Sequence, residues 1–250
     1  MINIGKENEY IEKLAEGISI VASELNPKQV IVRFSDFKTN EYKNLEGGEK
    51  YEPHEDNPLL GWRGVSRYIS PEFEKAFRLE CKAIKKVRET FENVYVMLPF
   101  VRTTWEVKKC INILSEEGLE RNENFKIYCM VEVPSVILCL EDFCEYFDGF
   151  SIGSNDLSML ILGVDRDSGK LGKMGYFDEN NPAILKAIKE VIEIAHANEK
   201  TVSLCGQAPS SNKEFAGFLV KCRIDSISIN PDIIIETKKF IHFVEKILDR

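Results

Sequence analysis

The hydrophobic residues of this chain form segments of two kinds, long ones with helical spacing and short continuous ones. Residues 9–24 carry apolar side chains at positions 10, 11, 14, 15, 18, 21 and 22, and this spacing predicts an amphipathic helix. Asn26-Pro27 should end the helix, because the residue before a proline disfavours helical backbone. Residues 29–34 are short and β-branched and predict a buried strand with Arg33 near its end.

Short apolar runs recur along the rest of the chain, and helix-like segments follow most of them. We predict further strands at 60–64, 94–100, 126–132, 150–153, 201–205 and 225–229. Helices are predicted at 71–90, where Ser70-Pro71-Glu72 has the residues of a helix start, and at 104–117, and others should begin near Pro134, Pro182, Gly206 and Pro231. Two polar segments, 38–58 and 163–181, are predicted loops.

The alternation of strands and helices, with strands that are apolar on both faces, predicts a parallel sheet covered by helices. Seven strands are one fewer than a (β/α)8 barrel has, and the chain starts with a helix. We therefore expect an α/β fold, a TIM-type (β/α)8 barrel lacking the first strand, as a single domain over residues 1–250. Such a barrel has two open edges, so we expect a homodimer, coverage of an edge by residues 1–25, or poor solubility.

Composition narrows the class of protein. The chain has 250 residues, a net charge of −8 and no basic block, which argues against a nucleic-acid partner. It has no apolar run of 18 residues and no signal-peptide pattern, which predicts no membrane partner and a cytoplasmic location. The seven cysteines are scattered, so neither disulfides nor a zinc site is expected, and all except Cys205 are interpreted as core residues.

Candidate chemistry lies at the carboxyl ends of the predicted strands, where barrels of this type carry their active sites. Glu132 and Asp156 are suited to a hard cation such as Mg²⁺, although Glu132 is equally consistent with a buried carboxylate paired with an arginine. Arg33 and Arg63 offer planar guanidinium groups for phosphate or carboxylate, or for structural salt bridges. Cys205 ends a strand before a glycine and is either a proton-exchanging thiol or a packed cysteine.

These residues belong to motifs that resemble the phosphoenolpyruvate-utilising enzyme family over most of the chain and in the family's order. The motifs lie at residues 30–42, 57–64, 98–103, 131–135, 150–158, 164–169 and 205–210. The versions SDFKTNEY at 35–42 and CGQAPS at 205–210 are similar to the synthase branch of the family.

The resemblance implies a transferase of the kinase type, cytoplasmic and part of gluconeogenesis, that binds phosphoenolpyruvate or pyruvate with Mg²⁺ in its barrel. A separate phosphohistidine domain would exchange the phosphoryl group with it. The resemblance further implies roles for individual residues. Metal ligands would be Glu132 and Asp156, substrate-binding residues would be Arg33, Arg63, Asn155 and Arg166, and Cys205 would transfer the proton at the methyl carbon.

Two departures from the family pattern leave other functions open. Ser158-Met159 stands where the family usually has Thr-Gln, and the sequence contains neither the ATP-binding nor the phosphohistidine domain, so we expect the isolated chain to be incompetent for the ATP-dependent reaction. A stand-alone metal-dependent aldolase or lyase on a related barrel would use the same enolate chemistry. A non-catalytic protein that only binds phosphoenolpyruvate or docks onto another subunit is the third hypothesis.

Overall fold

The computed structural model describes residues 5–248, and the chain divides into two compact units, residues 1–128 and 129–250. The elements of the first unit are α1 Glu7–Leu25, β1 Val30–Arg33, α2 Thr39–Lys43, η2 Gly48–Lys50, α3 Val65–Tyr68, α4 Glu74–Arg88, β2 Val94–Leu98 and α5 Thr104–Glu116. Strand β3, Ile127–Val131, begins in the first unit and ends in the second. This division does not test the predicted single domain over residues 1–250, which stays a prediction. Residues 1–4 and 249–250 of that predicted domain lie outside the described range.

The second unit continues the same alternation. Its elements are α6 Pro134–Leu138, α7 Leu140–Cys144, β4 Gly149–Gly153, α8 Ser154–Leu162, α9 Gly169–Lys173, α10 Pro182–Ala197, β5 Thr201–Cys205, α11 Ala208–Ser211, α12 Lys213–Lys221, β6 Ser226–Ile227, η3 Pro231–Ile233 and α13 Ile234–Leu248.

Strand pairing within each unit is parallel and follows chain order. In the first unit β1 pairs with β2, with Val30 opposite Val94, and in the second β4 pairs with β5 and β5 with β6. Parallel strands separated by helices are the pattern of α/β barrels. The predicted fold class is confirmed.

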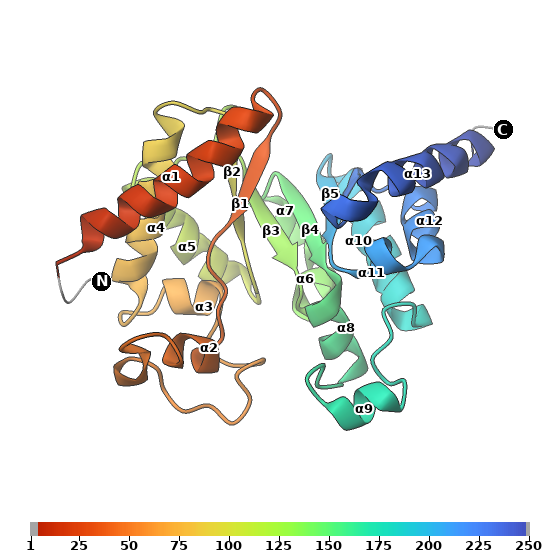
Figure 1. Cartoon of the computed structure of the whole chain (residues 1–250), viewed down its shortest axis with the longest axis horizontal. Helices are drawn as coiled ribbons and strands as arrows, with labels where there is room; N and C mark the ends of the chain where they lie inside the picture. Colours follow the sequence, from red (N-terminus) through yellow and green to blue (C-terminus); the bar gives the residue numbers. More distant parts are fainter. Residues whose placement is uncertain (1–4, 249–250) are drawn as a thin grey trace. The chain divides into compact units, whose positions relative to one another are not determined.

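Aromatic side chains form the core of the first unit. Phe34, Tyr68 and Phe77 are buried, with the rings of Tyr68 and Phe77 stacked 4.4 Å apart and Phe34 edge-on to Phe77. Helix α1 lies along α4 (Figure 1), and its residues Ala15, Ile18 and Ala22 are buried. These contacts join the first helix to the helical layer of its own unit.

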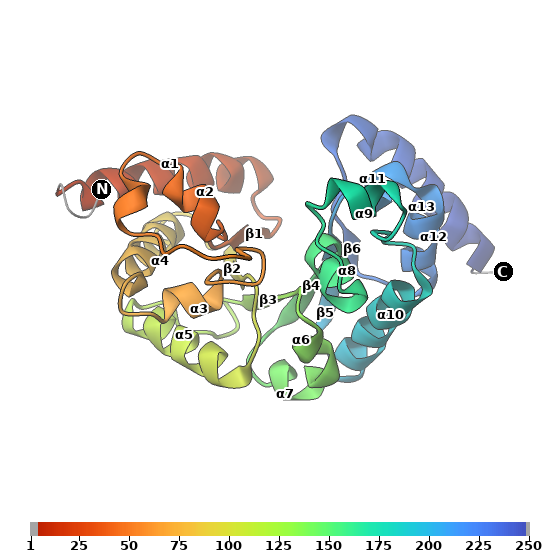
Figure 2. The same cartoon turned by 90° about the horizontal axis from the view of Figure 1, so that it is seen from below.

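The core of the second unit is built mainly from β4, β5 and one long helix. Asn181 caps α10 by accepting a hydrogen bond from Ala183 N at 2.9 Å, as the sequence predicts. The buried face of α10 consists of Ile184, Ala187, Ile188, Val191, Ile192 and Ala195. In Figure 2 this helix lies beside β4, β5 and α8, in agreement with the spacing of its apolar residues.

The predicted strand at 60–64 is wrong, because this segment is a turn. Side chains, not a neighbouring strand, bind its backbone: Trp62 N donates to Glu55 Oε1 at 2.8 Å, and Arg67 Nη2 donates to Trp62 O at 3.0 Å. Gly61 permits this turn, since a Cβ there would lie 2.3 Å from the Glu55 carboxylate. An apolar and aromatic run alone cannot reveal such partners.

Several predicted boundaries also differ. Ser70 does not cap α4, because its Oγ donates to Arg67 O at 2.8 Å, and the helix begins at Glu74. Strand β1 was expected to be buried but is only partly so, since it pairs with β2 on one side. The predicted loops 38–58 and 163–181 contain the short helices α2, η2 and α9.

All seven cysteines are free thiols. Cys81, Cys110, Cys129 and Cys144 are buried, as expected of core residues. The expectation is wrong for Cys139, which is exposed, whereas Cys205 and Cys222 are half-buried. Nothing in the described part of the chain tests the predicted homodimer.

Candidate functional site

In the second unit, the predicted metal ligand Glu132 lies against the end of β4. It follows β3, is 2% exposed, and packs on Gly153, where a Cβ would lie 2.5 Å from Glu132 Cγ and 2.8 Å from Oε1. Only glycine leaves room for the carboxylate at this distance. The residue that breaks the apolar run of β4 therefore creates the space in which Glu132 lies.

Cys205 emerges on the same face of the strands as Glu132. The last residues of β4 and β5, Gly153 and Cys205, are register partners, and paired residues of neighbouring parallel strands point to the same face. The side of Gly153 that faces Glu132 is thus the side to which Cys205 points. Cys205 is half-buried, whereas Cys81, Cys110, Cys129 and Cys144 are buried.

Asp156 and Asn155 lie in the first turn of α8, directly after β4. Asp156 is 6% exposed, and Arg166 from the following loop places Nη1 3.2 Å from its Oδ1. Asn155 is half-buried. A buried carboxylate requires a compensating cation, and in this structure Arg166 contributes that charge.

The carboxylates of Glu132 and Asp156 are chemically suited to a hard divalent cation, but the protein supplies only part of the ligand shell. Glu132 and Asp156 are two buried carboxylates, the number that protein sites commonly supply to Mg²⁺. Among residues 5–248 no group of three or more His, Cys, Asp or Glu side chains is arranged to hold a metal. Substrate and water oxygens would have to complete the shell.

A second group of polar residues lies on the other face of the same strand ends. Ser154 and Gly206 each follow one of the paired residues, and a Cβ on Gly206 would lie 2.2 Å from Ser154 Oγ and 3.7 Å from Glu179 Oε1. Ser154 Oγ and Glu179 Oε1 are buried without a hydrogen-bond partner in the described part of the chain. Burial raises the pKa of Glu179. Neither residue was predicted to be important.

In the first unit, Arg63 is held in place by Asp36. Nη2 and Nε of Arg63 donate to the two carboxylate oxygens of Asp36 at 2.6 and 3.1 Å, and both side chains are at most 4% exposed. The guanidinium carbon lies 4.0 Å from the centre of the Phe100 ring. The structural salt bridge that the sequence left open for Arg63 is therefore present, whereas Arg33 is exposed at the end of β1.

Sequence reasoning did not find Asp36. The signal was available, because Asp36 follows β1 as closely as the other candidates follow their strands. Active-site residues of such barrels follow the carboxyl ends of the strands. Considering every ionisable residue in the few positions after each strand, and not only the first one, would have identified Asp36.

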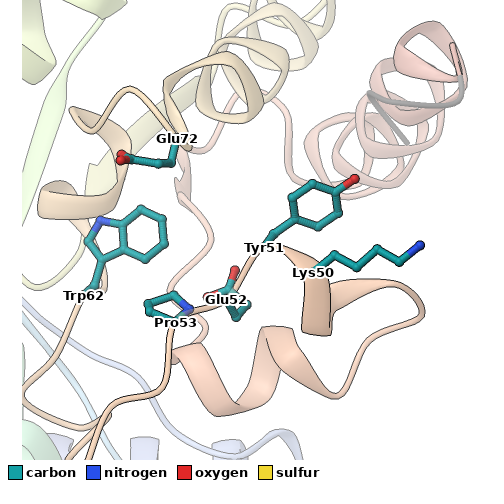
Figure 3. A pocket seen from close by; sticks show the side chains of 6 residues that line it. All are labelled: Lys50, Tyr51, Glu52, Pro53, Trp62 and Glu72. Atoms are coloured by element: carbon teal, nitrogen blue, oxygen red, sulfur yellow. The ribbon is translucent and has the colours of Figure 1, made fainter.

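The described residues also line an open pocket in the first unit, and one of its lining residues, Trp62, directly precedes Arg63 in the chain. Its volume is about 530 Å³ (Figure 3), and the lining residues are Lys50, Tyr51, Glu52, Pro53, Trp62 and Glu72. The indole of Trp62 lies between Pro53 and Glu72, whereas the amino group of Lys50 points away from it. None of the residues with predicted chemistry contributes to this pocket.

None of the helices within residues 5–248 combines the length and apolar character required to cross a bilayer. The predicted cytoplasmic location stays a prediction.

Comparison with known proteins gives one consistent result. Residues 1–246 match the family model described as PEP-utilising enzyme, PEP-binding domain. A probable phosphoenolpyruvate synthase from Staphylothermus marinus is 59% identical over 248 residues, which are 98% of this chain and 30% of that protein. Phosphoenolpyruvate synthases from Aeropyrum pernix and Escherichia coli are 56% and 49% identical, over 98% and 91% of this chain and 30% and 29% of those proteins. The chain thus spans about 30% of the length of these relatives.

Proposed function

Since the chain belongs to the phosphoenolpyruvate-utilising enzyme family, we propose that it is the phosphoenolpyruvate- and pyruvate-binding catalytic portion of a phosphoenolpyruvate synthase. The relatives that it resembles carry that name and are about three times longer. The proposal extends to gluconeogenic carbon flow in the cytoplasm, and to a phosphohistidine domain, outside these 250 residues, as the donor and acceptor of the phosphoryl group.

The observation that carries the proposal is the arrangement of Glu132 and Cys205 at Gly153. The Glu132 carboxylate and the Cys205 thiol lie on one face at the ends of neighbouring strands. A cation ligand and a proton donor could therefore reach the same substrate. Asp156, in the turn that follows Gly153, adds the second carboxylate.

The proposed chemistry requires a Mg²⁺ ion held by Glu132 and Asp156, which would supply positive charge for the enolate oxygen and the transferred phosphoryl group. Cys205 as a thiol gives its proton to the methylene carbon of enolpyruvate, forming the methyl group of pyruvate. In the opposite direction the thiolate removes that proton. A thiolate is a suitable base for this step because its ordinary pKa is close to neutral pH.

The substrate anion is assigned to arginines and one amide. In the second unit Asn155 and Arg166 would bind the substrate, with Arg166 leaving its contact of 3.2 Å to Asp156 for the substrate anion. In the first unit Arg63, fixed in its plane by Asp36, would contact the phosphoryl group together with Arg33. A planar guanidinium that is already oriented loses little rotamer entropy on binding an anion.

The proposal is tested by the exchange of pyruvate methyl protons with deuterated water, followed by NMR with and without Mg²⁺. This half-reaction needs neither ATP nor phosphohistidine. We expect Mg²⁺-dependent exchange that is lost in Glu132→Gln and Cys205→Ala but retained in Cys139→Ala, because Cys139 is exposed and outside the site. Exchange that is independent of Mg²⁺, or retained in both site variants, would contradict the assignment.

The alternatives make different predictions in the same samples. A metal-dependent aldolase or lyase would cleave a larger keto acid to pyruvate without phosphoryl transfer. A binding-only protein would bind phosphoenolpyruvate but exchange no protons. The position of Cys205 on the face that carries the Glu132 carboxylate favours the enzymatic hypotheses over the binding-only one.

A further inference from the structure

The turn that carries Arg63 is packed directly onto the end of β2. Gly64 has φ +58°, and a Cβ there would lie 2.4 Å from Pro99 O and 2.7 Å from Phe100 Cβ. Val65 N donates to Pro99 O at 3.3 Å. The orientation of Arg63 therefore depends on how residues 99–102 are held against this turn.

Arg102 binds the backbone of that turn at several points. Its Nη2 donates to Gly61 O at 2.7 Å and to Leu60 O at 3.4 Å. Its Nη1 donates to Ser66 Oγ at 3.2 Å and to Arg63 O at 3.4 Å. A planar guanidinium group with donors in fixed directions is required to reach acceptors on both sides of the turn.

Phe100 links the two arginines. The guanidinium carbons of Arg63 and Arg102 lie 4.0 and 4.5 Å from the centre of its ring. Phe100 itself has φ +48°, an uncommon conformation for a residue with a side chain, which persists only where surrounding contacts determine it. Burial lowers the pKa of Arg102, and the nearby charge of Arg63 acts in the same direction.

We propose that Arg102 is a positioning residue for Arg63, fixing the turn so that the Arg63 guanidinium is presented in one orientation to an anionic ligand. The proposal rests on the proposed function, in which Arg63 contacts the phosphoryl group of phosphoenolpyruvate. Arg102 acts through Arg63 and not as a separate source of charge for the ligand.

The test is a double-mutant cycle on phosphoenolpyruvate affinity, measured by isothermal titration calorimetry with Mg²⁺ present. We expect Arg63→Gln and Arg102→Gln each to weaken binding by about tenfold, and the double variant to be no weaker than Arg63→Gln alone. Arg102→Lys keeps the charge but loses the fork, so it should behave like Arg102→Gln. Lys109→Gln removes an exposed cation from α5 and should leave affinity unchanged.

Each other outcome has a distinct meaning. Additive losses in the double variant, or recovery of affinity in Arg102→Lys, would overturn the positioning role, because Arg102 would then act on the ligand by its own charge. The positioning role would also be overturned if Arg102→Gln bound phosphoenolpyruvate with wild-type affinity while Arg63→Gln bound it more weakly. Absence of phosphoenolpyruvate binding by the wild-type chain would instead refute the proposed function and this role together. Thermal unfolding of each variant shows whether a loss of affinity is due to misfolding. If Arg102→Gln misfolds, the affinity of Arg102→Lys tests the positioning role in its place.

Discussion

The buried ion pair between Arg67 and Glu52 gives the sharpest prediction for stability. The two side chains are 1% and 6% exposed, and two parallel hydrogen bonds of 2.7 and 2.8 Å join them. Trp62 and Tyr42 place their rings 4.0 and 4.6 Å from the Arg67 guanidinium carbon. Removing the Glu52 charge leaves a buried guanidinium group whose other contacts are the Trp62 carbonyl oxygen and the aromatic rings.

The expected cost of Glu52→Gln follows from these contacts. Removing one partner of a buried ion pair costs about 3–5 kcal/mol. The amide oxygen of glutamine can keep one of the two hydrogen bonds, and the aromatic faces retain some cation–π attraction, so we expect the lower end, about 3 kcal/mol. That is a large fraction of the stability of a typical domain.

The measurement is urea unfolding followed by tryptophan fluorescence. Both tryptophans, Trp62 and Trp105, lie in the first unit, so the signal reports on the unit that contains the substitution. Glu9→Gln, which removes an exposed pair with Lys13 at 2.8 Å on α1, should leave the midpoint unchanged. A loss below about 1 kcal/mol for Glu52→Gln would refute the reasoning, because it would mean that the pair is no more stabilising than an exposed one.

Three further predictions concern the second unit. Burial raises the pKa of Glu179 above its usual 4.5, so ionisation of this carboxyl group destabilises the folded state. In thermal melts, Glu179→Gln should therefore stabilise the protein at pH 7 but not below pH 4.5, and a gain in stability that is independent of pH would contradict this reasoning. Arg166→Gln should tighten Mn²⁺ binding in calorimetry without substrate, since Arg166 occupies Asp156 at 3.2 Å, and unchanged affinity would show that the two do not compete. Gly153→Ala should lower stability by about 1–3 kcal/mol in urea unfolding, because its Cβ would crowd Glu132; wild-type stability would mean that the carboxylate moves aside freely.

The strands were largely predictable because buried parallel strands have a strong sequence pattern. The runs that contain β2 and β3 are continuous and mainly apolar, those of β4 and β5 carry apolar residues at alternate positions, and a helix-like segment follows each. Their ends led directly to Glu132 and Cys205. Both lie where the alternation of strand and turn predicts, and the structure adds that they share a face.

The rest depended on side-chain partners that no periodicity in the sequence reveals. Leu60 to Gly64 has the composition of a strand, yet Glu55 and Arg67 satisfy its backbone as a turn. Ser70 has the composition of a cap, yet it bonds Arg67 O. Nothing in the sequence distinguishes a buried arginine such as Arg67 from an exposed one. Arg67 is buried against an acid fifteen residues away and against the rings of Trp62 and Tyr42.

Gly153 and Gly206 leave room for two different polar groups at the ends of β4 and β5. The missing side chain of Gly153 accommodates the Glu132 carboxylate, and that of Gly206 accommodates Ser154 beside Glu179. A side chain gained at 153 would displace the Glu132 carboxylate, and one gained at 206 would displace the Ser154 hydroxyl. In a newly sequenced relative, a larger residue at either position would therefore indicate that the polar group packed there has moved.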